Sequence, residues 1–227
     1  MSRLKTWLTA ALLAGPAISE PLACPGPGPT ITVTAGTTDH AVHLCSVARA
    51  ARSRLAACHM PQIAPIDIRI VTELPAQHAK CMGLYHCDTE IIEILDLAGL
   101  RRSVSPSSAF ARIPPEALQD SLVAHEMVHA LIHQRLGADS GPPVQNEYIA
   151  YAMQLDLMSD PARQALLAAR DITAPIPPEG LNEIILLMAP DVFAIFSWHH
   201  FRQEGHGCTL IGKLLDGAPG PFPNISP

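Results

Sequence analysis

Hydrophobic and polar positions follow one period in the first part of the chain and another in the rest. Residues 66–71 place an isoleucine at every second position, which is the spacing of a half-buried strand. Short runs of β-forming residues predict three more strands, at residues 31–34, 82–86 and 90–95. Residues 87–89 supply a turn that joins the last two strands. The first part of the chain therefore predicts a small sheet.

Helical spacing governs most of the remaining sequence. Residues 40–58 are rich in Ala, Leu and Arg and predict a helix capped by Thr38 or Asp39. A second helix is expected over residues 115–136, because it opens with proline and an acidic residue and ends before Gly137. Further helices are expected at residues 143–158, 161–170, 179–188 and 190–203. Strands followed by helices predict an α+β domain, with a small N-terminal sheet and a helical bundle.

Residues 98–115 show neither period and predict a loop. They contain Gly, Ser, Pro and Arg, and loops of this length inside a compact domain often serve function, for example as a lid. Arg101 and Arg102 within this segment would face either an acidic substrate or solvent.

Residues 1–19 are expected to form a secretory signal peptide. Arg3 and Lys5 precede an apolar run at residues 7–14 that is too short to span a bilayer. Small residues then precede a cleavage site before Glu20. The protein is therefore expected in the periplasm or outside the cell, and lipoprotein anchoring at Cys24 is the alternative.

Composition and charge narrow the class of the exported part. The chain has 227 residues, 48% apolar and 16% charged, which argues against a disordered chain or a coiled coil. A net charge of −6 argues against a nucleic-acid binder, and no apolar run beyond the N-terminus suits stable membrane insertion. We expect one domain at residues 20–215, acting as a monomer, and a flexible Pro/Gly tail at residues 216–227.

Six cysteines lie beyond the predicted cleavage site. In an oxidising compartment they predict three disulfides, whose pairing the sequence leaves open. Cys81 and Cys87 flank five residues and could staple a hairpin. Cys45 and Cys58 lie about 20 Å apart on one predicted helix, too far for a disulfide, and so cannot pair with each other.

The strongest chemical signal is His125-Glu126-Met127-Val128-His129 in the helix predicted at residues 115–136. Residues i and i+4 share one face of a helix, so both imidazoles can reach one metal ion. Glu126 is then placed to hold a water molecule on that metal. The helix is strongly apolar, and burying these polar groups without a partner would be costly. The pattern predicts a metal site.

A third protein ligand is expected from the next helix. A catalytic zinc ion takes three protein ligands and keeps one position open for water. Glu147 lies near the start of the helix at residues 143–158, which a short loop lets fold back antiparallel to the first. Asp139 and Asp156 are competing candidates, and His133 shares the face of His129 as a neighbour of the site.

These residues carry a resemblance to a known family. His125-Glu126-x-x-His129 followed by Asn146-Glu147-x-x-Ala150 resembles the gluzincin zinc metallopeptidases over about residues 116–158. The resemblance implies a zincin-like fold, with His125, His129 and Glu147 as Zn²⁺ ligands and Glu126 as general base.

The resemblance also implies a peptide or protein substrate, bound along an edge strand that residues 90–95 could supply. Two departures stand out. Tyr151 occupies the position where thermolysin-like members place an Asp, and no Gly-x-Met-Glu-Asn motif is present, so specificity for a free amino terminus has no support. The chain is also smaller than most members.

The implied chemistry is metal-assisted hydrolysis of a peptide bond. Glu126 would accept the proton of the attacking water and pass it to the leaving amine. Tyr151, Tyr85, His199 and His200 are candidates for stabilising the oxyanion. Two other classes stay open: an exported zinc-binding or partner-binding protein without turnover, and a disulfide-rich structural domain with a coincidental motif.

Overall fold

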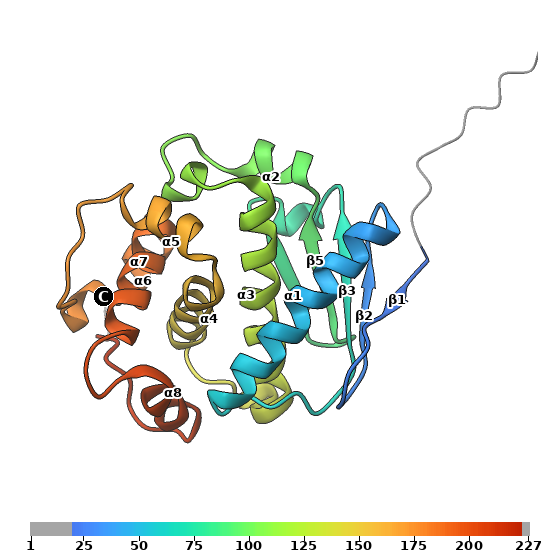
Figure 1. The fold of residues 1–227 in the computed structure, drawn as a ribbon. Helices are drawn as coiled ribbons and strands as arrows, with labels where there is room; N and C mark the ends of the chain where they lie inside the picture. Colours follow the sequence, from blue (N-terminus) through green and yellow to red (C-terminus); the bar gives the residue numbers. More distant parts are fainter. Residues whose placement is uncertain (1–19, 224–227) are drawn as a thin grey trace, which may run out of the picture.

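The computed structural model describes residues 20–223, so the predicted signal peptide at residues 1–19 lies outside the described residues (Figure 1). The described part of the chain contains five strands: β1 Leu22–Ala23, β2 Ile31–Thr34, β3 Ile66–Val71, β4 Gly83–His86 and β5 Ile91–Leu95. Its α-helices are α1 Thr38–Ala57, α2 Leu97–Ser103, α3 Pro115–Leu136, α4 Pro143–Leu157, α5 Asp160–Leu167, α6 Glu183–Met188, α7 Pro190–Phe201 and α8 Gly207–Leu215.

The strands form one mixed sheet in the order β1-β2-β3-β5-β4. Strands β2, β3 and β5 run parallel, and β1 and β4 pair antiparallel at the two edges. One face is apolar and buried, with Ile66 and Ile68 of β3 inside. The other face carries the ion pair between Asp67 and Arg69, so helices cover only one side. The four predicted strands are confirmed, and β1 was missed.

The prediction that residues 90–95 form an edge strand for substrate binding is wrong. Strand β5 lies inside the sheet, between β3 and β4, because it pairs parallel with β3 on one side. The hairpin that follows from the turn at residues 87–89 then leaves β4 as the free edge. The edge strand nearest the predicted metal helix is therefore Gly83–His86.

Helices stack in layers away from the sheet. Helices α1 and α3 lie on the buried face, α4 packs against α3, and α7 packs against the far side of α4 (Figure 1). Helix α1 begins two positions earlier than expected, because the cap is Thr37, whose side chain accepts a hydrogen bond from the His40 backbone N–H. The predicted α+β class is confirmed.

The prediction of a loop at residues 98–115 is wrong. Most of this segment is helical, as α2 and the 3-10 helix Ala109–Arg112. A polar side chain caps each helical turn: Asp96, just before the segment, accepts from the Gly99 N–H at 2.6 Å, and Ser108 within it caps the second turn. Its last part is anchored by Asp191 of α7, which accepts from the Ala109 N–H at 2.7 Å.

Two disulfides join distant parts of the chain, rather than the three predicted. Cys24 bonds to Cys45, and Cys58 bonds to Cys208, which fastens α8 to the end of α1. Cys81 and Cys87 are free. These two residues flank strand β4 instead of the turn, and an extended strand holds them about 20 Å apart.

The pairing also bears on two earlier expectations. Cys45 and Cys58 do not pair with each other, as predicted from their helix. Cys24 forms a disulfide, so its sulfur is not available for the lipid attachment that the lipoprotein alternative requires.

The C-terminal part of the described chain folds onto the helices. Helix α8 was missed, because its nine residues begin at one glycine and contain another. Phe222, within the predicted tail, packs its ring 5.5 Å from the ring of Tyr148 on α4. No helix among residues 20–223 is long and apolar enough to cross a membrane.

Candidate metal centre

Helix α3 brings three of the predicted residues together. Packing between the sheet and α4 buries most of its length, including His125 and Glu126. His129 lies one turn beyond His125 on the same face, and its side chain is partly exposed. One apolar helix therefore carries two imidazoles and a carboxylate into the interior.

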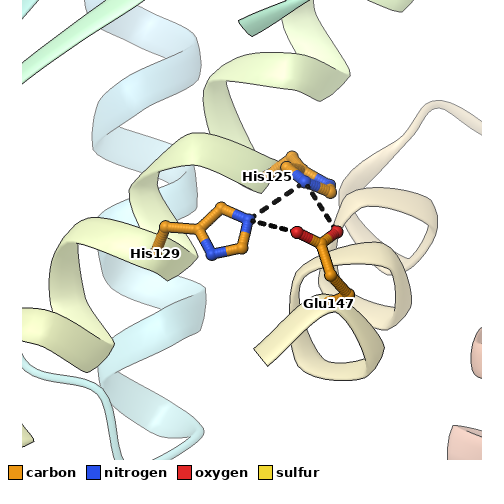
Figure 2. A group of neighbouring side chains, drawn as sticks. All are labelled: His125, His129 and Glu147. Atoms are coloured by element: carbon orange, nitrogen blue, oxygen red, sulfur yellow. Dashed lines mark hydrogen bonds and ion pairs between the residues drawn. The ribbon is translucent and has the colours of Figure 1, made fainter. Parts of the chain in front are cut away.

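Helix α4 supplies the third metal-binding group. Its first turns lie beside α3, and the Glu147 carboxylate points at both imidazoles (Figure 2). Nε2 of His125 and Nε2 of His129 are 3.2 Å apart. The two Glu147 oxygens lie 3.6 Å from Nε2 of His125 and 3.5 Å from Nε2 of His129.

These distances fit a tetrahedral metal ion. Ligand atoms about 2.05 Å from a zinc ion are about 3.3 Å apart at tetrahedral angles. The distance between the two Nε2 atoms is close to this value, and each imidazole has one Glu147 oxygen at 3.5 or 3.6 Å. One ligand atom from each residue lies within 4.8 Å of the others, so the group can hold a metal ion. The side chains of His129 and Glu147 are 20% and 29% exposed, so the centre is reachable from solvent.

The competing carboxylates lie elsewhere. Asp156 forms an ion pair with Arg54 at 2.9 Å, on the far end of α4. Asp139 lies in the short turn between α3 and α4, where it is exposed. The structure therefore brings Glu147, and neither aspartate, to the two histidines.

Burial sets the protonation of the ligand groups. Removal from water lowers the pKa of His125 well below its ordinary value and lowers the pKa of His129 to about 4. Burial raises the pKa of Glu147 to about 7. Neutral imidazoles present free lone pairs, which is the form that binds a metal ion.

Glu126 lies against the free edge of the sheet. A β-carbon on Gly83 of β4 would lie 2.5 Å from Oε1 of Glu126, so only glycine leaves room for this carboxylate. The backbone N–H of Tyr85 donates a hydrogen bond to it. Burial, with the nearby negative charge of Glu147, nevertheless raises the pKa of Glu126 to about 8.

The pairing of β4 with β5 explains why main-chain groups of β4 face the Glu126 carboxylate. Leu95 donates its N–H to the Met82 carbonyl, so alternate residues from Met82 onward direct their main-chain groups to β5. Gly83 and Tyr85 then direct theirs to the free edge, beside Glu126.

The two predicted tyrosines have different neighbours. The ring of Tyr151 lies edge-on to His125, with centroids 4.6 Å apart. Burial and the charges of Glu147 and Glu126 raise its pKa, so it stays a donor, and no residue among 20–223 hydrogen-bonds to its hydroxyl. The Tyr85 hydroxyl instead lies 2.9 Å from Nδ1 of His133.

The other predicted residues are not part of this group. His200 lies on α7 with its Nδ1 2.9 Å from the Tyr148 hydroxyl, and the ring of His199 lies edge-on to that of Trp198. Arg101 lies 3.6 Å from Glu116 on the exposed surface of α2.

Gln154 and Gly83 were missed by the sequence analysis. Gln154 Oε1 lies 3.0 Å from Nδ1 of His125, so Gln154 is the hydrogen-bond partner of this imidazole. It follows Glu147 by two helical turns and so shares its face, which is the signal that could have identified it. Gly83 carries no signal in the sequence, because its role depends on the approach of α3 to the sheet.

Comparison with known proteins gives one match. Residues 31–219 match the model of a family described as a family of unknown function (DUF6639). No curated protein and no solved structure matches the chain.

Proposed function

The chain belongs to the DUF6639 family, a family of unknown function, and we propose from its metal centre that it is a zinc metallopeptidase of the gluzincin type. The observation that carries the proposal is the convergence of the His125 and His129 Nε2 atoms, 3.2 Å apart, on the two Glu147 oxygens at 3.5–3.6 Å, with the Glu126 carboxylate beside them. A site that only bound a metal would need no buried carboxylate outside the ligand set.

The donor set favours zinc among the common metals. Two imidazoles and one carboxylate are a ligand set used by catalytic zinc in proteases, and three protein ligands leave one position open. When bound there, zinc polarises a carbonyl group and acidifies a water molecule. The position of β4 beside α3 supports a zincin-like fold for the α+β domain.

The chain's own residues account for the remaining steps. Glu126, buried beside the Glu147 carboxylate, accepts the proton of the attacking water and delivers it to the leaving amine. The Tyr151 hydroxyl, protonated and without another partner among the described residues, donates to the developing oxyanion.

An extended peptide would bind along the free edge of β4. The main-chain groups of Gly83 that face away from β5 offer it one donor and one acceptor, in the manner of strand addition. This strand replaces residues 90–95 as the proposed substrate edge.

Export is part of the proposal. Two disulfides join α1 to the end of β1 and to α8, and such bonds form and persist in oxidising compartments. We place the enzyme in the periplasm or outside the cell.

The test compares the wild-type protein with Glu126→Gln. We expect about one zinc ion per chain in both, measured by elemental analysis after gentle purification. On an unbiased peptide library the variant should cleave 10²- to 10⁴-fold more slowly, which is the usual contribution of a general base. Equal cleavage by both proteins would contradict the peptidase proposal. Zinc binding without cleavage by the wild type would favour the alternative, a non-catalytic zinc-binding or partner-binding protein.

A further inference from the structure

Three buried side chains form a hydrogen-bonded row behind the metal centre. Gln154 of α4 is fully buried and lies between two residues of α3. Its Oε1 is 3.0 Å from Nδ1 of His125, and its Nε2 donates to Oγ of Ser121 at 3.0 Å. Ser121 in turn donates its hydroxyl to the Leu118 carbonyl at 2.8 Å.

The direction of every hydrogen bond in this row is fixed. A backbone carbonyl can only accept, so the Ser121 hydroxyl hydrogen points at Leu118. Ser121 Oγ must then accept from Gln154, which requires the amide nitrogen to face Ser121 and the amide oxygen to face His125. That oxygen can only accept, so Nδ1 of His125 carries the hydrogen and Nε2 is left with its lone pair.

We propose that Gln154 and Ser121 are positioning residues that hold His125 in the tautomer and ring orientation that bind the metal ion. The inference rests on the proposed metal centre and adds to it two residues that do not touch the metal. Groups that hydrogen-bond a metal-binding histidine usually change metal affinity 10- to 100-fold when removed.

The amide also differs in charge from a carboxylate, which could accept the same hydrogen bond. Gln154 supplies an acceptor oxygen without adding a third negative charge next to Glu126 and Glu147, in a region where burial already raises the pKa of both carboxyl groups. A neutral partner that cannot rotate, because Ser121 holds its other end, orients His125 at a smaller electrostatic cost.

The experiment measures zinc affinity of the mature protein, with its disulfides intact, by competition with a chromophoric chelator. Gln154→Met removes the acceptor with little change of volume and should weaken zinc binding by 10- to 100-fold. Gln154→Glu keeps an oxygen at the same place and should bind zinc within about threefold of wild type. Equal losses in both variants would overturn the proposal.

Gln119→Met is the matched control. Gln119 is a similarly buried amide on α3, the helix of Ser121 and His125, but its Nε2 donates to the Leu95 carbonyl and its Oε1 faces His40. Its substitution should lower the melting temperature of the metal-free protein about as much as Gln154→Met and leave zinc affinity within about twofold. If Gln119→Met weakened zinc binding as much as Gln154→Met, the row would be merely structural and the proposal would fail.

Ser121→Ala tests the second residue and serves if Gln154→Met does not fold. It frees the amide to rotate, so a loss of about three- to tenfold in zinc affinity is expected, smaller than the loss from removing the acceptor. Unchanged affinity would remove Ser121 from the proposal. A wild-type protein that binds no zinc would refute the metal centre itself. If the wild type binds zinc tightly and no variant changes the affinity, the metal centre stands and the proposal for Gln154 and Ser121 fails.

Discussion

Helix α4 carries two clusters of buried tyrosine and histidine on opposite sides, and only one has the composition of a metal site. Glu147 and Tyr151 face α3, where the ring of Tyr151 lies edge-on to His125. Tyr148, the next residue after Glu147, faces α7, where its ring lies edge-on to His200 at 5.5 Å. Burial lowers the pKa of a histidine to about 4 on each side, His129 on one and His200 on the other.

The difference lies in what the imidazole nitrogens face. On the α7 side the Tyr148 hydroxyl lies 2.9 Å from Nδ1 of His200 and satisfies it. On the α3 side two Nε2 atoms and a carboxylate converge, and among the described residues this is the group able to hold a metal ion. Burial and a lowered pKa therefore do not identify a site; convergent acceptor atoms do.

The largest expected effect separates the two clusters by metal content. His129→Ala removes one of three ligands and should reduce bound zinc from about one per chain to near zero, whereas His200→Ala should retain it. Elemental analysis of both purified variants makes the comparison. Loss of zinc from His200→Ala in a folded protein would contradict the separation.

The next effect concerns the space beside Glu126. Gly83→Ala inserts one methyl group that must push the flexible end of this side chain aside, because the new atom would lie 2.5 Å from Oε1. A shift of about 1 Å in a catalytic group can cost about a hundredfold in rate, so we expect a loss of that order in kcat. Zinc content should stay the same, and a variant that cleaves peptides at the wild-type rate would show that the carboxylate is not held at the strand.

A smaller effect is the pH dependence of stability in the metal-free protein. The pKa values of Glu126 and Glu147 rise to about 8 and about 7 in the folded chain, above their ordinary value of 4.5. From about pH 7.5 upward the histidines are largely neutral in both states, so the folded protein holds carboxyl protons that the unfolded chain has lost. The free energy of unfolding should therefore fall between about pH 7.5 and 9, by on the order of 1 kcal/mol in total.

Urea unfolding at several pH values in a chelator measures this slope. Glu126→Gln should flatten it, because the neutral amide does not titrate. A slope that is unchanged in Glu126→Gln would mean that other groups control the pH dependence. His200→Gln, on the other side of α4, should leave this alkaline slope as it is.

The smallest effect belongs to the α7 side. Tyr148→Phe removes a buried hydroxyl and its hydrogen bond with His200, which should cost about 1 kcal/mol of unfolding free energy and leave zinc affinity unchanged. Denaturant unfolding and chelator competition on one preparation measure both. An altered zinc affinity would show that the two faces of α4 are coupled.

The sequence predicted the parts of this molecule that depend on local spacing. Period-two alternation located β3, and the i, i+4 spacing of His125 and His129 placed both on one face of α3. Segments whose polar residues act as caps were misassigned, as the helical turns begun by Asp96 and Ser108 show. The spacing of residues along the chain does not show whether a polar side chain caps a helical turn or belongs to a loop.

Long-range geometry accounts for the rest. The disulfide between Cys58 and Cys208 joins residues 150 positions apart, and no pattern near either residue indicates the other. The same holds for β4 as the edge strand and for Gln154 behind His125, because both depend on how α3 packs between the sheet and α4.

Because Gly83 has no side chain, the carboxylate of Glu126, more than 40 residues further along the chain, can lie against the strand. The three atoms that a β-carbon at this position would approach most closely all belong to Glu126, so a relative with a smaller residue at the helix position would lose these contacts. Relatives that keep both this glycine and the glutamate are expected to be catalytically active. Relatives in which both are replaced are expected to bind the metal ion without catalysing hydrolysis.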